Sequence, residues 1–425
     1  MMDIITLRRD LHQHPELGFT EFRTATKVVQ LLTEWGYQVI YGKDAIDDVS
    51  RRGLPKPEVL EDAYQRALSE GAEPSIVQHM RGGFTAVVAE LEGVHAGPTT
   101  AFRFDMDALP IRESASEQHV PQAGGFRSRH EGLMHACAHD GHTAIGLALA
   151  ERLRDRQFAG KVRLLFQPAE EGVRGAYAMV EKGMLEQVDR LFCMHLGTDV
   201  PSGEFRGASG GFLATTKLEA RFTGVSSHAG ASPEEGRNAL LGAATALLNI
   251  HALPRFSSAD TRINVGILEG GTGANIIPEQ ARMVIETRST SDETNRELER
   301  RVRNIIESSA TMHELEATVE VIGGAIPIHC DLELAELAAK EAESIEGFRR
   351  AVVLEDSAAL GSEDASYMIR RVQEQGGKGT YMIVGSDLPA PHHHPSFDID
   401  ERVLMPAVEL LERLARSAES GNGNQ

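Results

Sequence analysis

Residues 134–142 place several metal-binding side chains within one short turn. The stretch reads Met-His-Ala-Cys-Ala-His-Asp-Gly-His and includes Cys137, His139 and Asp140, just before an apolar helical run that begins near Ala144. Thiolate, imidazole and carboxylate are the ligands that zinc and neighbouring divalent metals prefer. A polar loop in which Asp140 caps the next helix is the alternative interpretation. The two are compatible, because a helix N-terminus lowers the pKa of a nearby cysteine and favours thiolate ligation.

Other candidate ligands follow short apolar runs that we expect to be strands. The runs end at Asp105, at Glu170 and Glu171, at His195, and shortly before the triplet His392, His393 and His394. Helical segments lie between the runs, and this alternation predicts an α/β fold with a mostly parallel sheet covered on both faces. Such sheets bind ligands beyond the carboxyl ends of their strands. We therefore expect these side chains to gather along one edge.

Glu170 and Glu171 could form no more than a solvated acidic loop. Beside a metal, one can act as a ligand while the other takes a proton from water and later passes it to a leaving amine. The candidate ligands then number five: Cys137, His139, Glu171, His195 and one residue of the histidine triplet. A structural zinc site needs only four. Five ligands favour two metals about 3.5–4 Å apart, with one ligand bridging them.

The chain has 425 residues, which is too long for one compact core. Between residues 211 and 324 the pattern predicts the order β-α-β-β-α-β, a split βαβ or ferredoxin-like unit. Residues 1–210 and 325–425 are then expected to form the α/β domain that carries the metals. Residues 43–82 are acidic and contain three prolines around a helical piece, so we expect a surface insertion there.

The composition restricts partners and compartment. The formal net charge of −20 argues against binding to nucleic acid or to an anionic membrane surface. The amino terminus has no apolar leader pattern, and no stretch approaches a transmembrane span. Three cysteines, an odd and sparse number, suit a reducing compartment. We therefore expect a cytoplasmic protein.

Five motifs occur in order through nearly the whole chain: Met-His-Ala-Cys-x-His-Asp-x-His, Phe-Gln-Pro-Ala-Glu-Glu-Gly, Met-His-Leu-Gly, Ser-His-Ala-Gly and Asn-Ile-Ile-Pro. Together they resemble the cocatalytic metallopeptidases that include hippurate hydrolase and the auxin-conjugate amidohydrolases. Residues 21–26, 141–147 and 361–365, with the 43–82 insertion, resemble most the aminobenzoyl-glutamate hydrolase branch of this family. The resemblance implies an amide hydrolase with two Mn²⁺ or Zn²⁺ ions and an inserted lid domain that also forms a homodimer. A hetero-oligomer is the alternative assembly.

The resemblance also implies roles for particular residues. Cys137 would bridge the metals, and His139, Glu171, His195 and His393 would complete the ligand set. His393 is selected from the triplet because the family's ligand lies two residues before the position of Pro395. The other implied roles are Glu170 as general base, His228 as oxyanion donor across the dimer, Asn275 and Arg288 as ligands of the substrate carboxylate, and Asp105 as a residue that orients the site.

Three positions depart from the family pattern. Ala138 replaces the usual glycine of the first motif, which constrains that loop. Ala274 and Ser232 replace an arginine and a lysine expected in the lid, and both changes remove cationic partners for a glutamate carboxylate.

Three functions therefore stay open. The first is hydrolysis of the amide bond of an aminobenzoyl-type N-acyl amino acid, an anionic aromatic substrate. The second is hydrolytic deamination of an aminobenzoate-type amine. The third is an inactive subunit, which predicts loss of ligands or base, although all of them are present.

Overall fold

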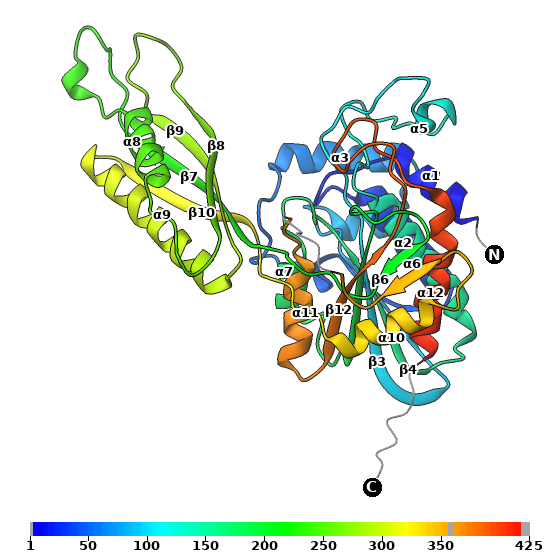
Figure 1. Ribbon diagram of the computed structural model, residues 1–425. Coiled ribbons are helices and arrows are strands. Elements are labelled where there is room, and N and C mark those ends of the chain that lie inside the picture. The colour runs from blue at the N-terminus through cyan, green and yellow to red at the C-terminus, as the bar shows by residue number, and fades with distance from the viewer. Residues whose placement is uncertain (1–2, 356–360, 418–425) are drawn as a thin grey trace. The chain divides into compact units, whose positions relative to one another are not determined.

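The structure is a computed structural model that describes residues 3–355 and 361–417. These residues divide into two compact units (Figure 1). The first unit contains residues 3–210, 328–355 and 364–417. The second contains residues 211–327 and 361–363, so it is inserted into the chain of the first.

The first unit is built on an eight-stranded sheet with the order β1-β2-β4-β3-β5-β12-β6-β11. The strands are β1 Gln38–Tyr41, β2 Val87–Glu92, β3 His95–Asp105, β4 Ala159–Gln167, β5 Arg190–Leu196, β6 Glu204–Arg206, β11 Arg350–Val352 and β12 Lys378–Val384. Strands β4, β3, β5 and β12 are neighbours in parallel, whereas β1 and β2 pair in antiparallel orientation. The predicted mostly parallel sheet is confirmed, and the carboxyl ends of its four central strands lie on one edge.

Helices cover this sheet. They are α1 Ile4–Gln13, α2 Phe22–Glu34, α3 Pro57–Ser69, α4 Pro74–Val77, α5 Val120–Ala123, α6 His139–Arg152, α7 Ala176–Glu181, α10 Leu332–Ala342, α11 Ala365–Glu374 and α12 Leu404–Arg416. Helix α6 is buried on all sides from His139 to Ala150, and small and apolar residues such as Ala144, Gly146 and Leu147 fill most of its length. A Cβ atom at Gly146 would come within 2.6 Å of the Phe104 ring, so glycine permits the close approach of α6 to β3. The most deeply packed helix therefore begins at a candidate ligand.

The segment 43–82 contributes to the core and is not only a surface insertion. Helix α3 buries Leu60, Ala63, Tyr64 and Ala67, which have the spacing of one helical face. The Tyr64 ring meets the Phe22 ring of α2 edge to face at 5.7 Å. The expectation of a surface insertion was thus wrong for the buried face of α3. The acidic residues of this helix occupy its other positions.

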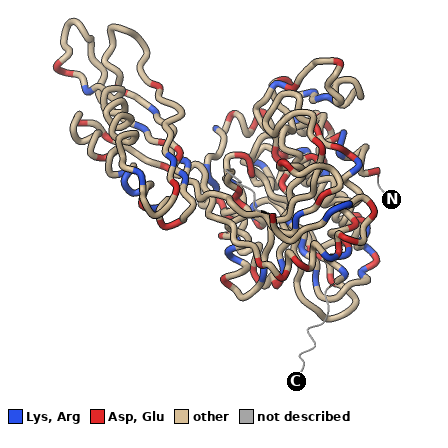
Figure 2. The backbone as a smooth tube through the Cα atoms, viewed as in Figure 1, with Lys and Arg blue, Asp and Glu red and all other residues tan. Residues whose placement is uncertain are grey.

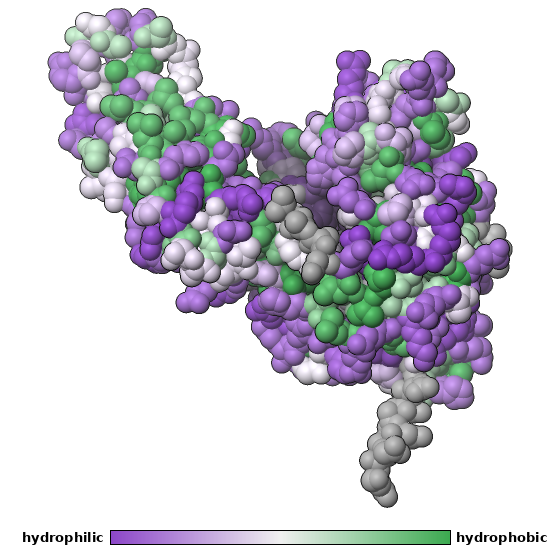
Figure 3. All heavy atoms as spheres, viewed as in Figure 1, coloured by the Kyte–Doolittle hydropathy of each residue, from purple (hydrophilic) through white to green (hydrophobic). Residues whose placement is uncertain are grey.

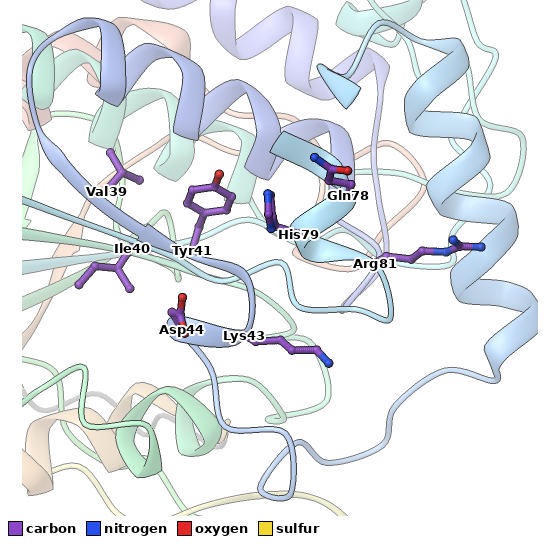
Figure 4. A pocket seen from close by; sticks show the side chains of 8 residues that line it. All are labelled: Val39, Ile40, Tyr41, Lys43, Asp44, Gln78, His79 and Arg81. Atoms are coloured by element: carbon purple, nitrogen blue, oxygen red, sulfur yellow. The ribbon is translucent and has the colours of Figure 1, made fainter. Parts of the chain in front are cut away.

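The two ends of this segment line an open groove of about 720 Å³ beside the edge strand β1 (Figure 4). Tyr41 and His79 meet there edge to face at 6.0 Å, and Lys43 and Arg81 also line it. The candidate metal ligands do not contribute to its walls, so the groove is separate from the metal centre described below.

The second unit confirms the predicted ferredoxin-like order. Its elements are β7 Ala214–Thr223, α8 Ala239–His251, β8 Thr261–Gly270, β9 Gln280–Ser289, α9 Asp292–Met312 and β10 Glu316–Ala325. The antiparallel sheet has the order β10-β7-β9-β8, which leaves β8 and β10 at its edges. Buried side chains such as Phe222, Ile285 and Leu298 join the sheet to both helices in a core separate from that of the first unit.

Acidic side chains occur over both units with basic ones among them, in agreement with the net charge (Figure 2). Within the described part of the chain, every helix is too short or too polar to cross a membrane.

Candidate metal centre

The Cys137 loop is held by its neighbours on both sides. The amide of Met134 donates to the carbonyl of Leu109 at 3.0 Å, and the amide of His393 donates to the carbonyl of Ala136 at 2.8 Å. Ala138, the N-cap of α6, has φ 68° and ψ 11°, in the left-handed region. Glycine adopts this region freely, but alanine does so at a cost. Ala138 is therefore strained, and a glycine, which the family resemblance leads us to expect here, would adopt this conformation without that cost.

Cys137 belongs to two groups of three candidate ligands. One group consists of Cys137, His139 and His195, and the other of Cys137, Glu171 and His393. Within each group the ligand atoms lie within 4.8 Å of one another. Sγ of Cys137 lies 3.5 Å from Nε2 of His195, and Nε2 of His393 lies 3.3 Å from Oε1 of Glu171. A ligand atom shared by two groups is positioned to bridge a pair of metal ions.

The three consecutive histidines have different surroundings. His393 reaches Glu171 and has φ 64°, a left-handed conformation that histidine adopts more readily than most residues. Nε2 of His392 accepts a hydrogen bond from the amide of Thr198 at 3.2 Å. Nδ1 of His394 accepts one from the amide of Ser396 at 3.0 Å. Of the three, only His393 is in a candidate metal group among the described residues.

Two atoms of the ligand set fit a cation well. Nε2 of His139 and Oε1 of Glu171 are buried and make no hydrogen bond within the described chain. Burial lowers the pKa of His139, but the carboxylates of Asp105 and Asp107 outweigh this effect and raise the pKa to about 10. The same carboxylates would favour a divalent cation, which takes the place of the proton when it binds the imidazole. Burial and the neighbouring imidazoles keep the pKa of His195 well below its ordinary value, so this ring is neutral and ready to ligate.

The loop that carries Glu170 and Glu171 is anchored through its backbone. Asp107 accepts hydrogen bonds from the amide of Glu170 at 2.9 Å and from the amide of Glu171 at 3.0 Å. Glu21 accepts one from the amide of Ala169 at 2.8 Å. Ala169 and Val173 have φ values of 52° and 60°. Strained residues on both sides of the two glutamates are typical of functional loops, where surrounding contacts hold the strain.

Asp105 lies behind the ligands, in a buried network. Its Oδ2 accepts from Nη1 of Arg103 at 2.6 Å, and its Oδ1 lies 2.5 Å from Nδ1 of His142. Nε2 of His142 accepts from the amide of Leu196 at 3.0 Å. The proton of a neutral His142 therefore lies on Nδ1 and is donated to Asp105. This network fixes the backbone next to His195.

The pattern of residues did not single out Asp107, Glu21 or Arg103. The Asp105-Met106-Asp107 spacing at a strand end was the available signal for Asp107, because residues two apart at the end of a strand point to the same face.

The remaining predicted residues lie in the second unit. Nδ1 of His228 accepts from the amides of Gly230 and Ala231, both at 3.1 Å, so its proton lies on Nε2 in the neutral form. His228 and Asn275 are on adjacent segments, where the amide of Ala229 donates to the carbonyl of Asn275. Arg288 lies on β9, and its Nε is 2.9 Å from Oε2 of Glu286. The structure thus brings His228 close to Asn275.

Residues 101–417 match the model of Peptidase family M20/M25/M40. The chain belongs to this family. It is 44% identical over 408 residues to indole-3-acetyl-aspartic acid hydrolase of Enterobacter agglomerans, covering 95% of this chain and 93% of that one. It is 42% identical over 410 residues to a subunit of p-aminobenzoyl-glutamate hydrolase from Escherichia coli K12, covering 96% and 94%. The M20 chain is therefore a hydrolase, and the family resemblance drawn from its motifs is confirmed.

Solved structures agree with the fold. The aminobenzoyl-glutamate utilization protein of Klebsiella pneumoniae superposes with a TM-score of 0.86 at 39% identity, covering 99% of this chain and 97% of that one. A Bacillus subtilis protein described as a dinuclear metal binding peptidase from the M20 family gives a TM-score of 0.63 at 27% identity, covering 97% and 96%.

Proposed function

We propose that this M20 hydrolase cleaves the amide bond between an aromatic acyl group and an acidic amino acid. The observation that carries the proposal is the membership of Cys137 in both candidate ligand groups, with Glu170 beside them. The names of the two relatives indicate the substrate class. In each name the substrate is an aromatic acyl group joined to aspartate or glutamate.

Two divalent ions would be held by Cys137, which belongs to both groups, by His139 and His195 of one group, and by Glu171 and His393 of the other. Mn²⁺ and Zn²⁺ both suit a set of thiolate, imidazole and carboxylate. When bound, the ions supply Lewis acidity that makes a water molecule more acidic and polarises the amide carbonyl.

The protein's own groups then move the protons. Glu170 takes a proton from the attacking water and returns it to the leaving amine, which departs as the free amino acid. His228 presents the Nε2 proton to the carbonyl oxygen as negative charge develops on it. Asn275 and Arg288 hold the α-carboxylate of the substrate, and Asp105 keeps the ligands oriented through His142.

A homodimer through the second unit is part of the proposal. Leu241 and Leu248 on α8 are 51% and 70% exposed, and Ile267 on the edge strand β8 is 41% exposed. Figure 3 shows hydrophobic side chains on the surface of the second unit. An unpaired strand edge next to exposed leucines is suited to a second copy of the same surface. The E. coli relative is called a subunit, so a complex with a different chain is the alternative.

We also propose a cytoplasmic location, supported by the sparse and odd number of three cysteines, which suits a reducing compartment.

Product analysis by mass spectrometry tests the function. The purified protein, loaded with Mn²⁺ or Zn²⁺, is offered aminobenzoyl-glutamate and a panel of aminobenzoates. Release of free glutamate is expected. Loss of ammonia from the aromatic ring with the amide intact would instead identify a deaminase. Turnover by the chain alone would exclude an obligatory partner chain.

A further inference from the structure

Arg52, in the segment between β1 and α3, rests on two aromatic rings of the first unit. Its guanidinium carbon lies 4.0 Å from the ring centre of Tyr177 and 5.4 Å from that of Tyr367. Its Nη1 donates to the hydroxyl of Tyr367 at 3.2 Å. The two tyrosine rings meet edge to face at 5.2 Å. Such stacking fixes the plane of the guanidinium and leaves the N–H donors on its edge available.

This cradle lies beside the loop of the two glutamates. Tyr177 is in the first turn of α7, which begins directly after that loop. Arg174 joins the two segments, because its Nη1 donates to the carbonyl of Gly53 at 3.0 Å and its Nε donates to the carbonyl of Glu171 at 2.8 Å. The side chain of Arg174 thus links the backbone of Gly53, next to Arg52, to the backbone of Glu171, a proposed metal ligand.

Tyr367 lies near the same edge of the sheet as the loop of the two glutamates. Tyr367 is in the first turn of α11, directly after Asp364. Oδ2 of Asp364 accepts from the amide of Ala176 at 2.9 Å, so α7 and α11 begin side by side. Both tyrosines therefore hold Arg52 near the amino-terminal ends of α7 and α11, at the edge of the sheet that carries the proposed metal ligands.

The charge of Arg52 has no carboxylate partner within residues 3–355 and 361–417. The adjacent Arg51 differs, since it pairs with Asp48, donates to the carbonyl of Gly82 at 2.7 Å and lies 3.7 Å over the ring of Phe84. Both side chains stack on aromatic rings, but only Arg51 has its charge balanced in this way. A guanidinium held flat with uncommitted donors is suited to binding a carboxylate.

We propose that Arg52 binds the side-chain carboxylate of the acidic amino acid in the substrate. The inference rests on the proposed amide hydrolase function and extends it to a specificity-determining residue. Ala274 and Ser232 offer no positive charge for that second carboxylate. The segment 43–82 then has a function besides its packing, because it supplies the cation that selects glutamate or aspartate conjugates.

The test compares aminobenzoyl-glutamate with aminobenzoyl-glutamine, which has nearly the same shape but a neutral side chain. Arg52→Gln should lower kcat/KM for the glutamate conjugate about 10- to 100-fold, mainly through KM, as expected for a lost hydrogen bond to a charged group. The same variant should change kcat/KM for the glutamine conjugate less than about 3-fold. Arg52→Lys should retain part of the preference, because it keeps the charge but loses the fork of donors.

Arg51→Gln is the matched control, since it removes a neighbouring stacked arginine whose charge is already paired. It should leave the ratio of kcat/KM between the two substrates unchanged. An equal loss on both substrates in Arg52→Gln would overturn the inference, because it would reveal a purely structural role.

Calorimetric binding of both conjugates to metal-free protein separates this inference from the proposed function. The wild type should bind the glutamate conjugate more tightly, and Arg52→Gln should abolish the difference. If the metal-loaded wild type cleaved neither conjugate, the proposed function would fail while the binding preference still decided the role of Arg52. If the metal-free wild type bound both conjugates equally well, the assignment of Arg52 to the side-chain carboxylate would be wrong.

Discussion

Oδ1 of Asp107 accepts a hydrogen bond of 2.9 Å from the backbone amide of Glu170. The other oxygen of the same carboxylate accepts from the next amide, that of Glu171. A single buried side chain therefore fixes two consecutive residues for which we propose different tasks, proton transfer and metal ligation. We therefore expect the separation of these tasks to depend on Asp107, because its carboxylate fixes the backbone of both glutamates.

Replacement of Asp107 by Asn should loosen this loop. An asparagine offers one acceptor oxygen and one NH₂ group, so one of the two amides would face a donor. We expect turnover to fall about 10- to 100-fold, the usual effect of removing a residue that orients metal-site groups. Steady-state kinetics measures the loss, with the exposed Asp44→Asn as control. Unchanged kcat would show that the loop holds its conformation without this carboxylate.

The two glutamates should respond differently to the same substitution. Glu170→Gln should keep both metals and lose most turnover, because the amide cannot take a proton from water. Glu171→Gln should lose metal, because a charged ligand becomes neutral. Metal analysis by mass spectrometry of the two dialysed variants gives the answer. Metal loss in Glu170→Gln would mean that the roles are exchanged.

Ala138→Gly should be better tolerated than Ala136→Gly. Both changes remove a fully buried methyl group and add backbone freedom to the unfolded chain. Only Ala138 has a positive φ, and relief of a left-handed alanine is worth about 1–2 kcal/mol. The free energy of unfolding of metal-free Ala138→Gly should exceed that of Ala136→Gly by about that amount. Equal values from urea unfolding would mean that Ala138 is not strained.

His12 should make the protein less stable at alkaline pH. Burial and Arg8 lower the pKa of His12, but hydrogen bonds to Asp140 and Glu113 outweigh them and raise the pKa to about 9. The unfolded value is about 6.5, so between these two pH values the folded state retains a proton that the unfolded state releases. The stabilisation is complete below pH 6.5 and is lost as pH rises through 9.

Urea unfolding of metal-free protein between pH 6 and 10 tests this sign. His12→Gln should flatten the alkaline fall in stability relative to the wild type, whereas the exposed His95→Gln should not. A wild-type curve and a His12→Gln curve with the same slope would contradict the prediction.

His228 should act in the site of the other protomer. His228→Ala should lower turnover without changing metal content, and Glu170→Gln should be nearly inactive. After mixing and exchange of the two variants, half of the dimers are mixed, and each has one intact site of two. Activity should then recover to about a quarter of the wild-type value. Absence of recovery, with exchange confirmed by native mass spectrometry, would place His228 outside the partner's site.

The sequence patterns predicted the parts of the fold that depend on local periodicity. The central strands and the β-α-β-β-α-β order of the second unit were found because apolar runs and turn residues mark them. The helical piece that became α3 was found, but its packing was misjudged because composition hides an apolar face of four residues. Asp107 was missed for a different reason. Its role arises from contacts with residues far along the chain, and no local pattern records such contacts.

Residues 211–327, nearly all of the second unit, lie in the chain between β6 and α10, and residues 361–363 complete it, so the ribosome makes the whole unit before β12 and His393. Cys137, His139, Glu171 and His195 precede it, and one proposed ligand follows it. During synthesis the nascent chain would expose an open thiolate and imidazole cluster while the inserted unit folds, since domains fold as units in order of synthesis. Complete metal loading must then wait until translation has nearly ended, and a truncated product that lacks the last segment could not hold both ions.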